Sequence, residues 1–431
     1  MNSENFVSSL REFLNHSPTP FHAVRSMQTR LDEAGFEALD ERQVWQLEPN
    51  QGYYVIRNGS SIVAFRTGAG SAVDKGVRMV GAHTDSPCLK LKPQPDIHRH
   101  GAYQWGAEVY GGALLNPWFD RDLSLAGRVV YLDNNDITGK ALIDFRRPVA
   151  TVPSLAIHLD REANNARSIN AQKDLPAVVL LPGEGEKKSV KAVLLAELER
   201  VNPELAAKEV LDFEMSLYDS QPAAIVGLEG DLLASARLDN LLSCYVGLRA
   251  LLDMEQGQAA LLVCNDHEEV GSMSAEGAQG PLLTSILRRW LGDGDYHRAM
   301  AGSMMVSADN AHAIHPNFAD RHDENHGPRI NQGPVIKVNN NQRYATNSVT
   351  SAFYRRLSGS LGLPCQTFVV RSDMACGSTI GPLTAANLGI KTLDIGVPQW
   401  GMHSIRETAG VKDCVNLYLV LKLFFASPEL P

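Results

Sequence analysis

Short polar motifs follow apolar runs at several places along the chain, and this pattern constrains the fold more than any other feature. Four of the runs have the length of a buried strand, and one further motif opens an amphipathic helix. The motifs are His83-Thr84-Asp85, Asp239-Asn240, His267-Glu268-Glu269, Asp309-Asn310 and Met402-His403. Because ligands of open α/β sheets collect beyond the carboxyl ends of the strands, the pattern predicts an α/β domain that gathers these side chains at one sheet edge.

Strand-like and helical patterns alternate at both ends of the chain. Apolar runs predict buried strands at 77–80, 259–264, 303–306 and 391–395. A helix is predicted near the end of the chain, at 415–425. This alternation is typical of a sheet covered by helices.

The middle of the chain has a different character. From about residue 92, short strand candidates alternate with Gly, Asn and Asp turns. The segment 192–218 has a largely helical pattern that Pro203 must interrupt. With 431 residues, the chain exceeds the roughly 250–300 residues at which single cores stop growing. We therefore predict an α/β domain formed by 1–91 and 237–431, interrupted by a mostly β domain at 92–236; a variable loop at 183–188 has no assigned role.

Charge and composition argue against several classes of protein. The formal net charge of −9 and the lack of a long Lys/Arg run argue against a nucleic-acid partner. No run approaches the roughly 20 apolar residues of a membrane helix, and the first residues lack the pattern of a secretory signal. The six cysteines are scattered without a CxxC pair, which favours reduced core thiols and a cytoplasmic location.

His83 and Asp85 have the spacing of a carboxylate–histidine–metal arrangement. If the imidazole binds a metal ion, Asp85 accepts the other ring N–H and fixes the tautomer. A loop histidine beside a turn-capping aspartate is the structural alternative, and the motif alone favours it. The other motifs reverse that preference.

Adjacent carboxylates at 268 and 269 follow a predicted buried strand. In isolation, a solvated acidic loop explains them equally well. The functional interpretation divides their roles: Glu269 binds a metal ion, while Glu268 takes a proton from metal-bound water and passes it to the leaving amine. Asp239 is either the N-cap of the following helix or the bridge between ions about 3.5–4 Å apart. Asp309 and His403 complete the set of ligands.

Taken in order, these motifs resemble the M18 family of metallopeptidases, the family of the aspartyl aminopeptidases. Two further motifs belong to the same resemblance, Asn339-x-Asn341-Gln342-Arg343-Tyr344-Ala345 and Cys376-Gly377-Ser378-Thr379-Ile380-Gly381-Pro382. The match extends over nearly the whole chain, and its motifs are far more specific for the family than for a substrate.

The resemblance implies a zinc-peptidase-type α/β domain with a mixed central sheet, interrupted by a β-rich dimerisation domain. It also implies two Zn²⁺ ions per subunit, with Mn²⁺ or Co²⁺ as alternatives. The implied ligands are His83 and Asp309 for one ion, Glu269 and His403 for the other, and Asp239 between them. Glu268 would be the general base, and Asp85 would be the partner of His83.

The resemblance further implies the removal of N-terminal Asp or Glu from short peptides by a tetrahedral dodecamer built from dimers. Lys337 and Tyr344 resemble the family's pocket for the acidic side chain, and Met402 would border it. His158 would reach the active site of a neighbouring subunit. The alternatives are an exposed strand lysine and a solvent-facing histidine. The long propeptide of the vacuolar members is not expected, because the sequence begins with an amphipathic helix.

Other functions remain open beside this one. A related two-metal hydrolase of different specificity, either a neutral aminopeptidase or an acyl-amino-acid deacylase, would use the same ligands. A catalytically silent metal-binding scaffold is a third class. Its hallmark would be a lost base or ligand, whereas Glu268 and all the implied ligands are present in the sequence.

Overall fold

The structure is a computed structural model that describes residues 2–183, 188–255 and 257–431. The chain divides into two compact units. The first unit comprises Met1–Asp85, Ala223–Met402 and Glu407–Pro431, and the second comprises Ser86–Pro222 and His403–Arg406. Of the variable loop predicted at 183–188, residues 184–187 lie outside the described part of the chain.

A mixed sheet forms the centre of the first unit, with the strand order β1-β2-β3-β13-β4-β14-β18-β16-β17. The strands are β1 (Glu37–Ala38), β2 (Gly52–Arg57), β3 (Ser61–Arg66), β4 (Arg78–His83), β13 (Ala260–Asn265), β14 (Met304–Ala308), β16 (Val335–Lys337), β17 (Gln366–Phe368) and β18 (Lys391–Gly396). Strands β13, β4, β14 and β18 run parallel to one another, whereas β3 and β16 pair antiparallel with their neighbours β13 and β18. The runs predicted as buried strands therefore form the middle of this sheet.

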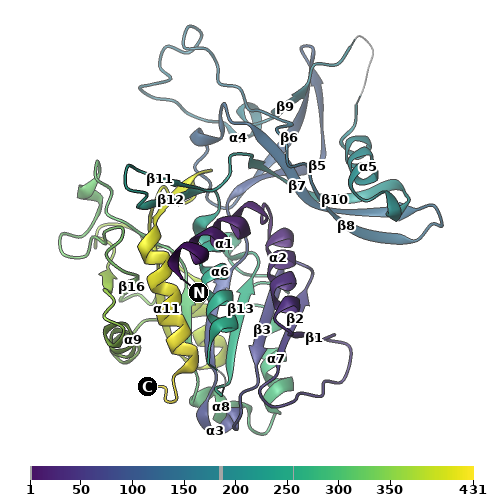
Figure 1. The fold of residues 1–431 in the computed structure, drawn as a ribbon. Helices are drawn as coiled ribbons and strands as arrows, with labels where there is room; N and C mark the ends of the chain where they lie inside the picture. The colour runs from purple at the N-terminus through teal and green to yellow at the C-terminus, as the bar shows by residue number, and fades with distance from the viewer. Residues whose placement is uncertain (1, 184–187, 256) are drawn as a thin grey trace. The chain divides into compact units, whose positions relative to one another are not determined.

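Helices cover both faces of the sheet. Alternate residues of a strand point to opposite sides, and the central strands carry apolar residues on both sides that helices bury. The helices are α1 (Ser3–Asn15), α2 (Pro20–Glu33), α3 (Ala72–Lys75), α6 (Leu238–Asp253), α7 (Leu282–Leu291), α8 (Tyr296–Ala301), α9 (Ser348–Ser360), α10 (Ile380–Leu388) and α11 (Val411–Ala426), with a 3-10 turn η3 (Glu268–Val270). Val80 and Leu262 pack in one apolar core with helices α1, α2, α6, α9 and α11, whereas Met79 and Leu261 pack in another with α7, α8 and α10. Figure 1 shows α1 and α11 in front of the sheet. The predicted α/β fold is confirmed.

A smaller sheet of the first unit has the order β11-β12-β20-β19-β15. Its strands are β11 (Ala224–Val226), β12 (Leu232–Ser235), β15 (Ala311–His312), β19 (Pro398–Trp400) and β20 (Glu407–Gly410). Because β12 pairs with β20, residues 224–235 cluster with the first unit, although the sequence-based bounds place them in the inserted domain. Among the described residues, no helix combines the length and the apolar character needed to cross a membrane.

The second unit is built on an antiparallel sheet with the order β8-β7-β10-β5-β6-β9. Its elements are β5 (Cys88–Arg99), β6 (Ala102–Tyr110), β7 (Leu123–Asp133), β8 (Thr138–Asp144), α4 (Ala171–Asp174), β9 (Ala177–Leu180), α5 (Val190–Val201) and β10 (Ala207–Asp219). The helical prediction for 192–218 is wrong beyond Val201. Pro203 opens a short 3-10 turn, and the following residues pair with β7 along its whole length. That pairing is non-local, so no helical periodicity in the segment could reveal it.

Arg78, at the start of β4, is a fully buried cation whose guanidinium donates to backbone carbonyl oxygens. The acceptors are Lys75, Gly76, Ser427 and Pro428, at 2.8–2.9 Å. Burial lowers the pKa of Arg78 to about 10, so the side chain is still charged at neutral pH. The side chain thereby ties the segment after α11 to the start of the strand that carries His83.

We expect Arg78→Ala to lower the free energy of unfolding by at least about 3 kcal/mol, because several buried carbonyl groups lose their donor. Arg298→Ala is the matched control. Arg298 pairs with Asp74 and Asp295 but is 64% exposed, and exposed ion pairs contribute only about 0–1 kcal/mol. Thermal unfolding by calorimetry measures both variants. Equal falls in Tm would contradict the structural role assigned to Arg78.

Candidate metal centre

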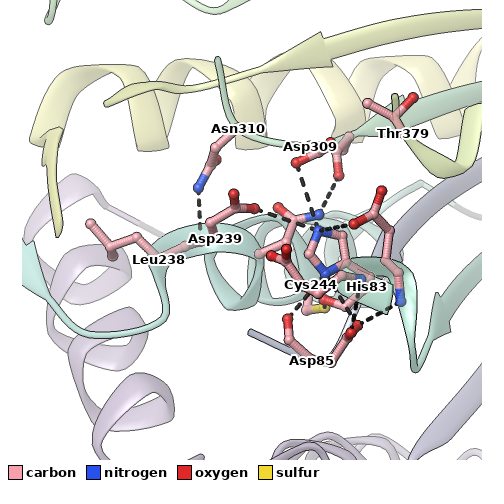
Figure 2. Close-up of polar contacts among 12 residues, drawn as sticks. His83, Asp85, Leu238, Asp239, Cys244, Asp309, Asn310 and Thr379 are labelled. Atoms are coloured by element: carbon pink, nitrogen blue, oxygen red, sulfur yellow. Dashed lines mark hydrogen bonds and ion pairs between the residues drawn. The ribbon is translucent and has the colours of Figure 1, made fainter. Parts of the chain in front are cut away.

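The neighbouring parallel strands β13, β4 and β14 end at one edge of the sheet, and motif residues follow their carboxyl ends. His83 is the last residue of β4. Glu268 and Glu269 open the turn η3 shortly after β13, and Asp309 follows β14 directly. Figure 2 shows Asp239 and Asp309 pointing toward the His83 ring. The structure thus brings these side chains together from distant parts of the sequence.

The His83 imidazole is buried and has a defined orientation. Its Nδ1 lies 3.0 Å from the backbone oxygen of Asp85 and must donate, because a carbonyl group only accepts. Nδ1 therefore carries a proton, and Nε2 faces the carboxylates. Nε2 lies 3.5 Å from Asp239 Oδ1, 3.7 Å from Asp309 Oδ1 and 4.0 Å from Glu268 Oε2.

Asp239 reaches this cluster from an irregular start of α6. Arg237 occupies the N-cap position with a left-handed φ of +59°, and the backbone of Asp239 and Asn240 is non-helical. The Asp239 N–H donates to Glu407 Oε2 at 2.9 Å. Asp239 is therefore not the simple N-cap of the structural alternative, and its carboxylate faces His83.

Asp85 holds the turn that carries the adjacent glutamates. Its Oδ1 accepts the N–H of Glu268 at 3.1 Å, and its Oδ2 accepts the N–H of Glu269 at 3.0 Å. Asp85 Oδ1 also lies 3.4 Å from His83 Nδ1, but the hydrogen bond of that nitrogen goes to the backbone oxygen of Asp85. The carboxylate therefore orients the Glu268 turn as well as adjoining the histidine.

Negative charge is concentrated in this buried cluster. Burial, followed by the charges of Asp309, Asp85 and Asp239, raises the pKa of Glu268 to about 7, against the opposing effect of His83. Burial lowers the pKa of His83, but its interactions with Asp239, Asp309 and Asp85 outweigh burial and raise the pKa well above its usual value. The crowded carboxylates contribute to both pKa shifts, and a bound cation would stabilise their negative charge.

The donor set fits a divalent metal ion. The ligand atoms of His83, Asp239 and Asp309 all lie within 4.8 Å of one another, and so do those of His83, Glu268 and Glu269. Ligands of one tetrahedral Zn²⁺ lie roughly 3.3 Å apart, given bonds of about 2.0–2.1 Å. The separations of 3.5 and 3.7 Å from His83 Nε2 to the aspartates are close to that spacing. Imidazole and carboxylate donors suit Zn²⁺ and Mn²⁺ alike.

Lys337, at the end of β16, lies beside the cluster and is 3% exposed. Its ammonium group lies 3.2 Å from both Asp309 Oδ2 and the backbone oxygen of Asn310. The ring centroid of Tyr344 is 5.1 Å from Lys337 Nζ, and Tyr344 packs with Phe368 in a small apolar cluster. Lys337 is therefore not the exposed strand lysine of the alternative interpretation.

The other predicted site residues lie in loops. His403, which clusters with the second unit, donates from Nδ1 to the carbonyl oxygen of Gly112 at 3.1 Å. If His403 holds a metal ion, the proton on Nδ1 makes Nε2 the ligating nitrogen, as in His83. Met402 is half-buried in the turn after β19, and His158 is exposed in the second unit, between β8 and α4.

Sequence reasoning missed a buried carboxylate near the proposed substrate pocket. Asp394 in β18 is fully buried and accepts from Thr379 Oγ1 and from the N–H of Ala345, both at 2.6 Å. Asp394 thereby links the motif at 339–345 to the motif at 376–382. In the sequence, only the family resemblance connected these two motifs with the site. The sequence assigned no role to the buried side chains of Asn310, Gln399 and Glu407, and two of their hydrogen bonds reach residues far away in the sequence.

Known proteins match this chain over nearly its whole length. The family model for aminopeptidase I zinc metalloprotease (M18) matches residues 13–425. A protein named probable M18 family aminopeptidase 2, from Pseudomonas fluorescens strain SBW25, is 57% identical over 429 residues, which is 99% of this chain and 100% of that protein. A protein of the same name from Pseudomonas putida strain KT2440 is 57% identical over 425 residues, covering 98% and 99%.

Solved structures are similar in fold as well. A chain in the cryo-EM structure of the Ape4 and Nbr1 complex has a TM-score of 0.94 and 37% identity, and the match covers 98% of this chain and 86% of that chain. An M18 aminopeptidase from Thermotoga maritima has a TM-score of 0.85 and 25% identity, covering 98% and 96%. The S. cerevisiae mApe1 dodecamer has a TM-score of 0.83 and 30% identity, covering 98% and 97%.

Proposed function

This chain belongs to the M18 family of metal-dependent aminopeptidases, and we propose that it removes N-terminal Asp or Glu from short peptides with the help of two divalent metal ions. The observation that carries the proposal is the convergence of one imidazole and several carboxylates at the ends of β4, β13 and β14. A lysine buried beside the same cluster supplies a positive charge for an acidic substrate side chain.

In this proposal His83 and Asp309 hold one ion, Glu269 and His403 hold the other, and Asp239 bridges them. The proximity of the Asp239 and Glu269 carboxylates, within 4.8 Å, supports the bridge. The Nδ1 hydrogen bonds of both histidines support ligation through Nε2. When bound, such ions lower the pKa of a coordinated water and polarise the scissile carbonyl. Zn²⁺ is the proposed ion, with Mn²⁺ or Co²⁺ as alternatives.

Glu268 is the proposed general base. Its carboxylate lies 4.0 Å from His83 Nε2, at the centre of the cluster, while Asp85 holds the Glu268 backbone N–H. Glu268 takes a proton from the attacking water and delivers it to the nitrogen of the leaving amine, so that one group acts first as base and then as acid. Asp85 acts by orientation, because it fixes the turn from which Glu268 projects.

Lys337 is the proposed partner of the substrate's side-chain carboxylate, with Tyr344 and Met402 at the border of the same pocket. A buried ammonium recognises a carboxylate through a charge-assisted hydrogen bond. Lys337 already lies 3.2 Å from one carboxylate, that of Asp309. The proposed pocket would therefore lie beside the ligands that would hold the substrate's amine end and scissile carbonyl.

The proposal extends to assembly and location. The S. cerevisiae mApe1 structure is a dodecamer, and we propose a tetrahedral dodecamer of dimers for this chain. The second unit would mediate dimerisation, and His158, exposed in one of its loops, would reach the active site of a neighbouring subunit. The scattered cysteines favour the cytoplasm as the location.

A substrate panel tests the proposed specificity. We expect kcat/KM to be highest for peptides that begin with Asp or Glu, lower for those that begin with Leu, and negligible for N-acetylated amino acids. Faster turnover of the Leu substrate would favour a neutral aminopeptidase. Preferred hydrolysis of the acetylated compounds would favour an acyl-amino-acid deacylase, and no turnover of any substrate would favour a silent scaffold.

Lys337→Met is expected to lower kcat/KM for the Asp substrate by about 10–100-fold relative to the Leu substrate, because one charge-assisted hydrogen bond is lost. Lys391→Met, at an exposed position of β18, is the matched control and should leave the ratio unchanged. Metal analysis of both variants accompanies the kinetics, because Lys337 also contacts Asp309. An unchanged Asp-to-Leu ratio in Lys337→Met would contradict the assigned role.

A further inference from the structure

The peptide group between Leu238 and Asp239 is held at both of its polar ends. Its carbonyl oxygen accepts from Asn310 Nδ2 at 2.8 Å, as Figure 2 shows, and its N–H donates to Glu407 Oε2 at 2.9 Å. This peptide immediately precedes the side chain proposed to bridge the ions. Its orientation therefore helps to decide where the Asp239 carboxylate points.

Gln399 joins the two side chains that hold this peptide. Its Oε1 accepts from Asn310 Nδ2 at 3.0 Å, and its Nε2 donates to Glu407 Oε1 at 3.4 Å. The peptide, Asn310, Gln399 and Glu407 thus form a closed hydrogen-bonded ring. All three side chains are at most 3% exposed, so water is poorly placed to replace a lost partner.

The polarity of every bond in the ring follows from the peptide itself. The Leu238 carbonyl can only accept, so the amide nitrogen of Asn310 must face it. The same Asn310 nitrogen also faces the Gln399 side chain. Gln399 must therefore direct its Oε1 toward Asn310 and its Nε2 toward Glu407. The Asp239 N–H can only donate, so Glu407 accepts through both of its oxygens. The ring therefore needs an amide group at position 399 and two acceptor oxygens at position 407.

The ring also connects the proposed ligands. Asn310 follows Asp309 in the chain, so the ring reaches the segment of that proposed ligand. A second link comes from Asn240, the residue after Asp239, which donates from Nδ2 to the carbonyl oxygen of Ala308 at 2.8 Å. Hydrogen bonds therefore link the backbone on either side of Asp239 to the backbone around Asp309. Groups that orient metal ligands in this way typically contribute about 10–100-fold in metal affinity.

We propose that Gln399 and Glu407 are positioning residues for the metal centre. They hold the peptide group before Asp239 in a fixed orientation, so that the Asp239 carboxylate stays correctly placed relative to Asp309. The inference rests on the proposed function, because it takes Asp239 and Asp309 as metal ligands. Neither Gln399 nor Glu407 touches the reacting atoms in this account. They act through the peptide and through Asn310.

The test is a swap of the amide and the carboxylate. Gln399→Glu places two carboxylates against each other, and Glu407→Gln places two amide groups where an acceptor is needed. We expect each single variant to lose metal to a chelator about 10–100-fold faster than the wild type, with kcat lowered more than KM is raised. The double variant Gln399→Glu/Glu407→Gln restores every donor–acceptor pair in the ring, and we expect its metal loss to return close to the wild-type rate.

The control is the same exchange at exposed positions, Glu33→Gln/Gln43→Glu, which should leave metal loss unchanged. The readout is metal content over time by elemental analysis after addition of the chelator. Single variants that keep metal as well as the wild type would overturn the inference. A double variant that loses metal as fast as the single variants, or that fails to fold, would also overturn it. Wild-type protein that never binds metal would instead contradict the proposed function, and therefore also the inference that rests on it.

Discussion

The Glu268→Gln variant is expected to turn over substrate at least about 10²-fold more slowly than the wild type. The amide keeps the size of the side chain but cannot take a proton from the attacking water. Because Asp85 accepts from the backbone N–H of Glu268, which the substitution leaves in place, the turn η3 should be preserved. Steady-state kinetics at saturating substrate measure the effect, and KM should change little.

Metal content and assembly distinguish a lost base from a damaged site. We expect Glu268→Gln to retain the wild-type metal stoichiometry and oligomeric state, measured by elemental analysis and light scattering. Glu276→Gln, in the same loop region and partly exposed, is the matched control and should keep full activity. Near-normal turnover in Glu268→Gln would rule out this residue as the base.

The Asp239→Asn variant is expected to lose metal as well as activity. An amide has one neutral oxygen in place of two anionic ones, so it bridges two cations poorly. Since Lewis-acid assistance and water activation each contribute several kcal/mol, we expect activity to fall by at least about 10³-fold. Elemental analysis should show fewer than two ions per subunit.

The recovery of activity after metal is added back distinguishes the Asp239→Asn variant from the wild type. Wild-type protein stripped by a chelator should regain activity when Zn²⁺ is returned, whereas Asp239→Asn should not. Asp293→Asn, at an exposed position just after α7, is the matched control. An Asp239→Asn variant with full metal content and activity would exclude Asp239 as the bridge.

The success of the fold prediction has a local cause. The central strands are buried on both faces, so each appears in the sequence as a continuous apolar run, and the structure places those runs in the middle of the sheet. The failure at 192–218 has the opposite cause. Strand β10 is stabilised by its pairing with β7, more than 70 residues earlier in the chain, and propensity within the segment cannot represent that contact.

The site shows the same division. A histidine or carboxylate after a buried strand is visible in the sequence, so His83, Glu269 and Asp309 could be singled out there. Lys337 could not be separated from an exposed strand lysine until its burial against Asp309 was known. The part of Asp85 in holding the Glu268 turn also required the fold, because nearly 200 residues separate the donor from the acceptor.

The sequence by itself therefore determined the class of fold, the edge of the sheet at which the site forms and the types of residue offered to a metal ion. Periodic burial and strand-terminal placement are properties of neighbouring residues, so one sequence suffices to recognise them. Only the tertiary structure decided which polar groups meet: the ring through Asn310, Gln399 and Glu407, and the tie between Asp394 and the substrate-side segments. Those contacts depend on strand order and register, which bring distant residues within hydrogen-bond distance and which no local pattern specifies.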